Sequence, residues 1–387
     1  MNTLSCDIAI IGGGPVGASL ALALRDSGLQ VCVLEARPAH AASHDARALA
    51  LSYGSRLLLQ RLGVWEALHD VSSIRTIHIS QRQSFGRAML RAAELNVPEL
   101  GYVLPYPALQ ASLDQALQHS GISMIYGASV TRLCGETDYS EIAYKQNDAE
   151  HMLRARLAVV ADGGKLLAQQ CPPQVRDYGQ SALITHITCS APQVNMAYER
   201  FTAQGPVALL PFQNGYELVW TAPHKDAQEM LAWDDGKFLA ELQHHFGDRV
   251  GKFLTVAKRT SFPLGLKRAP NLTPMPHTVL LGNAAQTMHP VAGQGFNMGL
   301  RDAWELAQEI LNAIPEALGT GAMLKTYCSH RRTDREAGIH FTDGLVRLFS
   351  NELPLISAGR AAALSALDCL PLAKKFVAKR MMFGANG

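Results

Sequence analysis

The first 35 residues constrain the fold more than any other stretch. Residues 7–11 are a short, mostly β-branched apolar run, typical of a strand buried on both faces. Gly12, Gly14 and Gly17 follow directly, then a helical pattern of apolar residues, then a second apolar run that ends at Glu35. Strand, glycine turn, helix, strand and acid in this order predict the dinucleotide-binding unit of a Rossmann-like α/β domain.

Each marked position of this unit has a physical task. The first glycine allows the turn, the second leaves room for a pyrophosphate, and the third lets the helix pack closely on the strand. Glu35 is expected to accept hydrogen bonds from the ribose hydroxyls of the adenosine. Since this spacing occurs once in the chain, we expect one bound dinucleotide.

Two further segments place glycines after short apolar runs. Residues 157–161 end in Asp162-Gly163-Gly164, and residues 278–281 end at Gly282, ahead of a loop and a helix that begins near Gln294. A strand feeding a glycine loop and a helix N-terminus presents backbone N–H groups to an anion or a ring. The alternatives are a plain turn and an ordinary loop-to-helix junction. Three such edges exceed the needs of an adenosine and suit a long, folded ligand such as FAD.

The length of 387 residues predicts two domains. Residues 178–265 contain several β-rich runs, a hairpin signal at residues 213–215 and one helix, which indicates an inserted antiparallel sheet with helical cover. Residues 74–79 alternate as a strand does, whereas residues 84–98 read as irregular. The expected division is an FAD-binding domain of residues 1–70, 99–175 and 271–320, a substrate domain of residues 71–98 and 176–270, and a C-terminal helical region of residues 321–387.

Composition and charge limit the expected cellular location and the expected binding partners. The net charge of +2 gives no reason to expect nucleic acid, and the seven scattered cysteines favour free thiols in a reducing compartment. No uninterrupted apolar run is long enough for a bilayer, so we expect the cytoplasm, with the surface of the inner membrane as an alternative. Residues 360–387 carry five basic residues against one acid among many apolar ones, which fits a helix on anionic lipid or a helix packed on the body or on a partner.

The remaining inventory points to cofactor chemistry. The chain has no Gly-x-Ser-x-Gly, no His-Glu-x-x-His and no Cys-x-x-Cys. His289, next to Pro290, is more often a structural histidine than a base or a metal ligand, and no metal is expected. The protein would then orient and desolvate a bound cofactor that carries the reaction.

Taken together, these motifs resemble the single-component flavin-dependent aromatic hydroxylases that act on para-hydroxybenzoate and related phenols. The three family motifs correspond to residues 12–17, Asp162-Gly163 and residues 282–299, in the same order. The stretches Asp45-x-Arg47-Ala-Leu-Ala-Leu, Phe201-Thr-x-x-Gly205-Pro206, residues 282–297 and residues 343–349 are similar to the ubiquinone-biosynthesis branch, and within it to the 2-polyprenyl-6-methoxyphenol 4-hydroxylases.

The resemblance implies an FAD-dependent monooxygenase of ubiquinone biosynthesis. NAD(P)H would reduce the flavin as a transient co-substrate, O2 would add to form a C4a-hydroperoxide, and the ring of a polyprenylated phenol would be hydroxylated. A membrane surface, a biosynthetic complex and a homo-oligomer are the partners that it suggests. A flavin reductase or dehydrogenase without oxygen insertion, and a non-catalytic FAD-stabilised scaffold subunit, are the alternatives.

The resemblance also assigns the site residues. Pro290 and Gly295 are implied at the catalytic face of the flavin, with the carbonyl near Pro290 as a candidate acceptor for the phenol. The implied cofactor contacts are Gly12, Gly14, Gly17, Glu35, Arg47, Gln110, Asp162, Gly282, Asn283, Pro290, Gly293, Gln294, Gly295, Phe296 and Asn297. From the residues alone, Arg47 is equally a solvated surface arginine.

Two positions depart from the family pattern. Asn283 replaces an aspartate that would bond the ribityl chain; because an amide still accepts one such bond, the loss is about 1 kcal/mol. Gly164 and Lys165 follow Asp162-Gly163 where a serine and an arginine are usual, which bears on how the nicotinamide docks.

Overall fold

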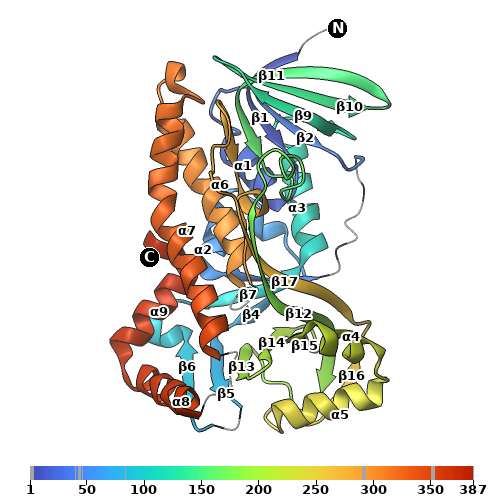
Figure 1. Cartoon of the computed structure of the whole chain (residues 1–387), viewed down its shortest axis with the longest axis vertical. Coiled ribbons are helices and arrows are strands. Elements are labelled where there is room, and N and C mark those ends of the chain that lie inside the picture. Colours follow the sequence, from blue (N-terminus) through green and yellow to red (C-terminus); the bar gives the residue numbers. More distant parts are fainter. Residues whose placement is uncertain are drawn as a thin grey trace.

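In the computed structural model, a parallel sheet and a large antiparallel sheet occupy opposite ends of the molecule, and the long helix α7 (Gly321–Phe349) runs alongside from one towards the other (Figure 1). The structure describes residues 4–39, 41, 45, 47–82, 84–289, 293–349 and 354–386. Within these residues, no helix is both long enough and apolar enough to cross a membrane. The predicted α/β class with an antiparallel insertion and a helical tail is confirmed.

The parallel sheet contains the strand that opens the chain. Its strands are ordered β8-β2-β1-β11-β18, and the hairpin β9-β10 continues it along the first half of β11. Their bounds are β1 (Leu4–Ile11), β2 (Val31–Glu35), β8 (Ser123–Tyr126), β9 (Ser129–Gly135), β10 (Ser140–Gln146), β11 (Ala149–Val160) and β18 (Thr278–Leu280). Every residue of β2 and the last four residues of β1 are buried, as their continuous apolar runs predict.

Three helices pack around the first strand of this sheet. They are α1 (Pro15–Ala23), α3 (Tyr106–Gln118) and α6 (Gln294–Asn312). Helix α1 contacts both α3 and α6, which come from distant parts of the sequence. The α6 helix presents Leu300, Ala303 and Leu306 to the core.

The large sheet contains nine strands within the described residues and is antiparallel except where β5 pairs in parallel with β13. Its order is β19-β17-β12-β15-β14-β13-β5-β6, with β16 paired to β12. The bounds are β5 (Thr76–Gln81), β6 (Arg87–Arg91), β12 (Gln174–Cys189), β13 (Met196–Thr202), β14 (Gly205–Phe212), β15 (Gly215–Pro223), β16 (Phe253–Val256), β17 (Thr260–Arg268) and β19 (Gln286–Thr287). Helices α4 (His224–Ala232) and α5 (Asp235–Phe246) form the cover; two helices stand where the sequence indicated one. The hairpin predicted at residues 213–215 is confirmed, because Phe212 pairs with Gly215.

The strand predicted at residues 74–79 is confirmed with a break at Arg75, and the irregular stretch predicted at residues 84–98 is wrong. The alternating run at residues 74–79 is two strands, because β4 (Ser72–Ile74) pairs with β7 (Gly101–Pro105) whereas β5 joins the large sheet beside β13. The stretch read as irregular contains β6 and a short 3-10 helix (Ala92–Leu95). Residues 87–91 form a strand because β5 supplies their backbone hydrogen-bond partners, which the composition of the stretch does not indicate. Strand β3 (Ala48–Ser52) completes a small sheet with β7 and β4.

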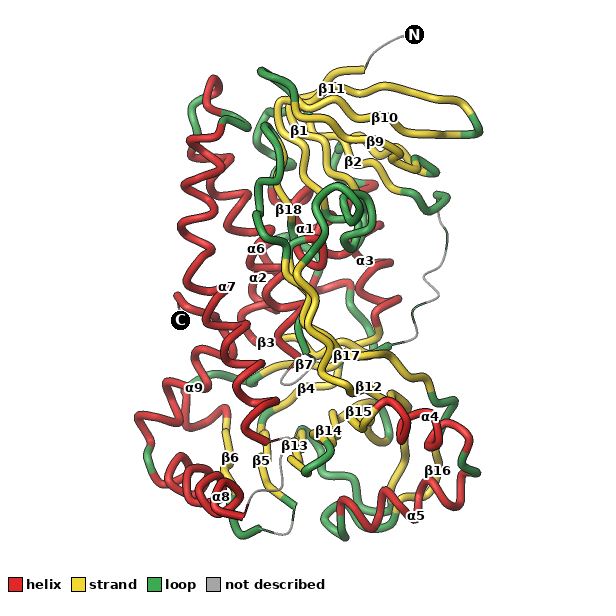
Figure 2. The backbone as a smooth tube through the Cα atoms, in the orientation of Figure 1, coloured by secondary structure: helices red, strands yellow, loops and turns green. Residues whose placement is uncertain are grey.

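The C-terminal region packs on the body, as one of the alternatives for residues 360–387 predicts, while binding of lipid or of a partner stays a prediction. Helix α8 (Pro354–Cys369) lies against β6, and α9 (Pro371–Phe383) lies against α2 (Tyr53–Arg61). Figure 2 shows both helices beside the large sheet, at the end of α7. The buried ammonium group of Lys374 lies 2.9 Å from Asp368 and 3.3 Å from Glu94.

Candidate functional site

The three glycines of the first motif occupy three different environments. A Cβ atom on Gly17 would lie 2.0 Å from the carbonyl oxygen of Gly12, so this glycine lets α1 sit directly on the turn. Gly12 has a φ of +106°, and a Cβ there would lie 2.6 Å from the carbonyl oxygen of Ala161. A Cβ on Gly14 would meet no described atom within 4 Å. The first and third positions therefore serve the fold, and the second borders open space where a ligand can approach.

The other two glycine motifs close around the same helix end. Gly282 and Gly299 both approach Val16, the second residue of α1, so closely that added Cβ atoms would lie 3.1 and 2.9 Å from one of its methyl groups. A Cβ on Gly164 would lie 3.1 Å from the carbonyl oxygen of Asn283. Segments that are far apart in the sequence thus meet near the N-terminus of α1.

Glu35 holds the glycine turn in place. Its carboxylate accepts hydrogen bonds from the backbone N–H of Gly13 at 2.7 Å, and from the backbone and side chain of Arg37 at 2.8 and 3.1 Å. Gln110 donates to the carbonyl oxygen of Gly13 at 3.0 Å. The buried Oε1 of Gln110 has no partner among the described residues, so an acceptor for a ligand hydroxyl remains. Both predicted contacts lie at the glycine turn.

Arg37 is a candidate that the sequence reasoning missed. Its guanidinium bonds Glu35, and one nitrogen lies 3.4 Å from the carbonyl oxygen of Gly13 and another 3.7 Å from Asp114. This places a cation beside the turn that is expected to hold a pyrophosphate. Its position, two residues after the acid that ends β2, was the available signal.

Asp162 shapes its own loop. Its carboxylate accepts the backbone N–H groups of Gly164, Lys165 and Leu166 at 2.8, 3.0 and 2.6 Å. These bonds tighten the turn after β11 and leave Gly163 exposed with a φ of +83°. The loop therefore offers backbone rather than a free carboxylate to a neighbouring ligand.

Arg47 directly precedes β3 and contacts β17. It forms an ion pair with Asp45, and its guanidinium stacks over the ring of Phe262 in β17, 5.3 Å from the centroid. Its contact with FAD stays a prediction.

The N-terminus of α6 is fixed by one amide. Asn297 Oδ1 accepts the backbone N–H of Ser52 at 2.8 Å and the hydroxyl of Ser55 at 2.7 Å, while its Nδ2 donates to the carbonyl oxygens of Ala50 and Gly293. The side chain of Asn297 is therefore engaged within the protein, and its predicted cofactor contact would have to come from the backbone.

The glycines at this helix end leave it open. Gly293 caps the helix with a φ of +61°, and a Cβ on Gly295 would meet no described atom within 4 Å. Gln294 donates to the carbonyl oxygen of Met381 in α9 at 3.2 Å. Asn283 is exposed and Phe296 packs at the margin of the core. Pro290 lies outside the described residues.

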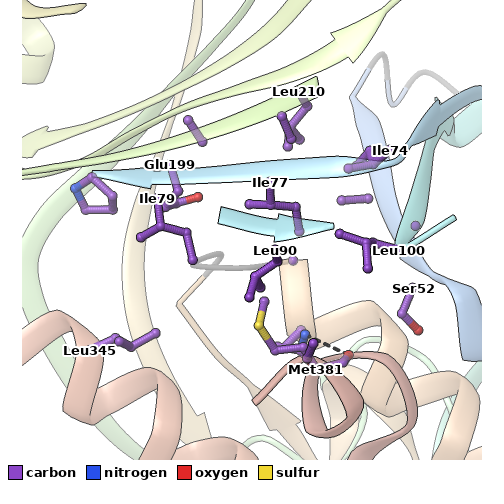
Figure 3. A pocket seen from close by; sticks show the side chains of 18 of the residues that line it. Ser52, Ile74, Ile77, Ile79, Leu90, Leu100, Glu199, Leu210, Leu345 and Met381 are labelled. Atoms are coloured by element: carbon purple, nitrogen blue, oxygen red, sulfur yellow. Dashed lines mark hydrogen bonds between the residues drawn. The ribbon is translucent and has the colours of Figure 1, made fainter. Parts of the chain in front are cut away.

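A cavity of about 270 Å³ adjoins this helix end and is walled mainly by apolar side chains (Figure 3). One wall is a face of the large sheet, where alternate residues of β5, β13, β14 and β15 line the cavity. The opposite wall comes from α7, α8 and α9, and includes Leu345, Leu364, Leu367 and Met381. Burial lowers the pKa of His289, at the helix end of the cavity, to about 4, so its imidazole is neutral near pH 7.

This arrangement fits a dinucleotide whose ring system reaches the cavity. The open position at Gly14 leaves room for a pyrophosphate, and the unpartnered acceptor of Gln110 can accept a hydrogen bond from a ligand hydroxyl. The bare backbone at Gly163 and Gly295 lets a flat ring approach closely. Among the described residues, no group of three or more metal-binding side chains is present.

Comparison with known proteins agrees with this geometry. The FAD binding domain family matches residues 5–342. The chain is 32% identical to the 3-demethoxyubiquinol 3-hydroxylase of Escherichia coli over 95% of its own length and 96% of the relative's. It is 33% identical to a ubiquinone hydroxylase of Rhodospirillum rubrum, over 97% and 89% of the two chains.

The fold agrees with a solved structure of lower identity. The p-nitrophenol 4-monooxygenase of Pseudomonas putida superposes with a TM-score of 0.80 at 16% identity, over all of both chains. The family match shows an FAD-binding domain, and FAD is the cofactor.

Proposed function

This chain belongs to the FAD-binding-domain family of flavin-dependent aromatic hydroxylases, and on that premise we propose that it hydroxylates the ring of a polyprenylated phenol in ubiquinone biosynthesis. Its motifs are most similar to those of the hydroxylases that act on a 2-polyprenyl-6-methoxyphenol, so this phenol is the proposed substrate. NAD(P)H and O2 are the co-substrates typical of this class.

The observation that carries the proposal is the continuity of the cavity with the N-terminus of α6. Gly293 and Gln294 line it at one end, and Leu364, Leu367 and Val377 line it at another. An aromatic ring held beside the helix end would leave its prenyl chain against aliphatic side chains. Burying each methylene of that chain contributes about 0.8 kcal/mol, which favours a prenylated phenol over a simple one.

The protein's own groups would prepare the reaction. When bound, the reduced flavin supplies an activated oxygen to the ring. The first backbone N–H groups of α6 have no carbonyl partner within the helix, so they stabilise negative charge on the nearby edge of the flavin by roughly 0.3–2 kcal/mol. The apolar walls exclude water from the reacting atoms.

A labelled-oxygen assay tests this function. The purified flavoprotein receives NADH or NADPH, ¹⁸O₂ and a soluble 2-methoxyphenol with a short prenyl chain. We expect nicotinamide oxidation that the phenol stimulates, and one labelled atom in the product. Turnover in the absence of O2 would instead indicate a reductase, and a flavin that no nicotinamide reduces would indicate a scaffold subunit.

We further propose that α9 rests on an anionic membrane surface. Leu372 and Phe376 are 84% and 60% exposed, Lys375 and Lys379 are exposed beside them, and Met381 on the inner side lines the cavity. Apolar side chains flanked by lysines suit insertion at a lipid headgroup boundary. From that position the prenyl chain of a membrane-dissolved phenol has a short path to the cavity.

Vesicle sedimentation tests the surface. The wild type should bind vesicles that contain phosphatidylglycerol, and the double variant L372E/F376E should lose most of this binding. V194E is the matched control, because Val194 is 84% exposed on the loop between β12 and β13. Equal binding by both variants, or none by the wild type, would contradict the assignment.

A further inference from the structure

The cavity wall contributed by the large sheet contains one charged side chain. On β13, the alternate residues Ala197, Glu199 and Phe201 line the cavity, and the neighbouring strands contribute Ile79 from β5 and Ala208 from β14. Among the described lining residues, Glu199 is the only one with a formal charge at neutral pH. Figure 3 shows its carboxyl group beside Ile79, within the apolar wall.

The carboxyl group of Glu199 has no hydrogen-bond or ion-pair partner among the described residues. Its register neighbours are Ile79 and Ala208, neither of which has a polar side chain. Burial raises the pKa of Glu199 to about 7. A carboxyl group placed in an apolar wall without a partner lowers stability, so its presence calls for a ligand that it can bond.

A second glutamate on the same sheet shows the contrasting case. Glu217 in β15 is buried, whereas Glu199 is partly exposed, and desolvation raises the pKa of Glu217 to about 7 as well. Its carboxylate, however, accepts the backbone N–H of Ala48, and it does not line the cavity. Glu217 holds β3 against the sheet, whereas Glu199 faces the space where a substrate would lie.

We propose that Glu199 is the catalytic base that accepts the hydroxyl proton of the phenol bound in this cavity. The assignment rests on the proposed function, since it requires a phenol. The cavity that contains Glu199 also borders Gly293 and Gln294 at the start of α6, so a ring between them can present its hydroxyl to the carboxylate and its carbon atoms to the flavin.

The proton transfer is balanced without a further reactant. The O–H bond of the phenol breaks as its proton bonds to a carboxylate oxygen of Glu199, and the electron pair left on oxygen raises electron density at the ortho and para carbons. After oxygen transfer, the substituted carbon loses its hydrogen as a proton, and the carboxyl proton returns to the phenolic oxygen. Glu199 ends as it began.

The other titratable residues that line the cavity, Tyr198 and His289, are less suited to this role, since burial raises the pKa of the Tyr198 hydroxyl. His289 is neutral near pH 7, but with its pKa lowered to about 4 it is a weaker base than a carboxylate whose pKa is about 7. The elements packed against Glu199, namely β5, β14, α7 and α8, present apolar side chains to the cavity. The ionisation of Glu199 would therefore govern activity near neutral pH.

Equilibrium binding to the oxidised holoenzyme tests the contact without turnover. The probes are 2-methoxy-6-prenylphenol and its methyl ether, which lacks the hydroxyl. At pH 8 we expect the wild type to bind the phenol about tenfold more tightly than the ether, as a hydrogen bond to a charged acceptor implies. This preference should disappear in E199A and shrink in the wild type at pH 6, where the carboxyl group is protonated.

Turnover tests the base. E199Q, which keeps the size of the side chain, should hydroxylate the phenol at least about 100-fold more slowly at pH 8. It should also lose the rise in rate with an apparent pKa near 7 that the wild type shows, whereas E217Q should keep that rise. With a fluorinated phenol that is already ionised at pH 8, the ratio of wild-type to E199Q rates should fall.

The outcomes separate the two proposals. An E199A variant that still prefers the phenol, or an E199Q variant that keeps the rise in rate near pH 7, overturns the assignment of Glu199. A wild type that shows the Glu199-dependent preference but forms no oxygenated product overturns the proposed function and leaves Glu199 as the group that receives the phenol. A wild type that binds no phenol overturns both.

Discussion

The two ends of the molecule recognise their ligands by different means. At the parallel sheet, the groups expected to face the dinucleotide are mostly backbone: the open positions at Gly14 and Gly163 and the N–H groups at the start of α6. At the large sheet, the cavity is formed mainly by side chains, including alternate residues of β5, β13, β14 and β15 and residues of α7, α8 and α9. Ligand recognition at the dinucleotide end therefore depends on positions without side chains, and recognition in the cavity depends on which side chains line it.

This difference explains how each end tolerates change. A backbone site needs glycine at a few fixed positions, and substitution there acts on the fold or on the cofactor. A side-chain cavity keeps its shape as long as its volume and polarity are kept, so substitution there acts on the substrate. Four predictions test this division, from the largest expected effect to the smallest.

The glycine motif should separate folding from flavin binding. In G17A the new methyl group would lie 2.0 Å from a carbonyl oxygen, so the free energy of unfolding should fall by about 3 kcal/mol or more. In G14A the methyl group meets only open space, so thermal unfolding of the apoprotein should be unchanged while FAD affinity falls. Equal stability of the two apoproteins would break the comparison.

Filling the cavity should affect the substrate and spare the flavin. Ala208 lines the cavity beside Glu199, so A208F should displace the phenol and lower kcat/KM for a polyprenylated substrate by roughly 100-fold. The flavin content and the visible spectrum of the purified protein should match the wild type. A proportional loss of flavin would show that the two ends are not independent.

The amide of Asn297 joins the two ends and should affect both. N297A leaves the backbone N–H of Ser52 and the carbonyl oxygen of Ala50 without their partners, which should lower the free energy of unfolding by about 2 kcal/mol. FAD affinity and turnover should fall together in this variant. Denaturant titration, with S55A as a control that loses only one of the bonds, measures the stability effect.

The smallest effect concerns pH and stability. Because the pKa of Glu199 is raised from 4.5 to about 7, between these values the folded protein retains a proton that the unfolded chain has lost. The wild type therefore loses stability as pH rises through this range, and E199Q does not. E199Q should be more stable than the wild type by about 1–2 kcal/mol at pH 8, and the two should converge below pH 5. A difference that does not change with pH would argue against a neutral carboxyl group in the fold.

The sequence by itself determined the FAD-binding end. Gly12, Gly14, Gly17 and Glu35 lie within one strand-helix-strand unit, and their task depends on local backbone geometry that residue type and spacing specify. The helix in residues 235–246 and the hairpin at residues 213–215 were predictable for the same reason, since period and turn chemistry are local.

Only the tertiary structure decided the substrate end. Strand β13 pairs with β14 and with β5, and this register makes Glu199 a neighbour of Ala208 and Ile79. Because β5 comes from a distant segment of the chain, no local sequence pattern encodes the pairing. The strand β6 and the engagement of Asn297 with Ser52 likewise depend on partners distant in sequence. A cavity is a property of surfaces brought together, so its lone carboxylate became recognisable as a candidate base only once its apolar neighbours were in place.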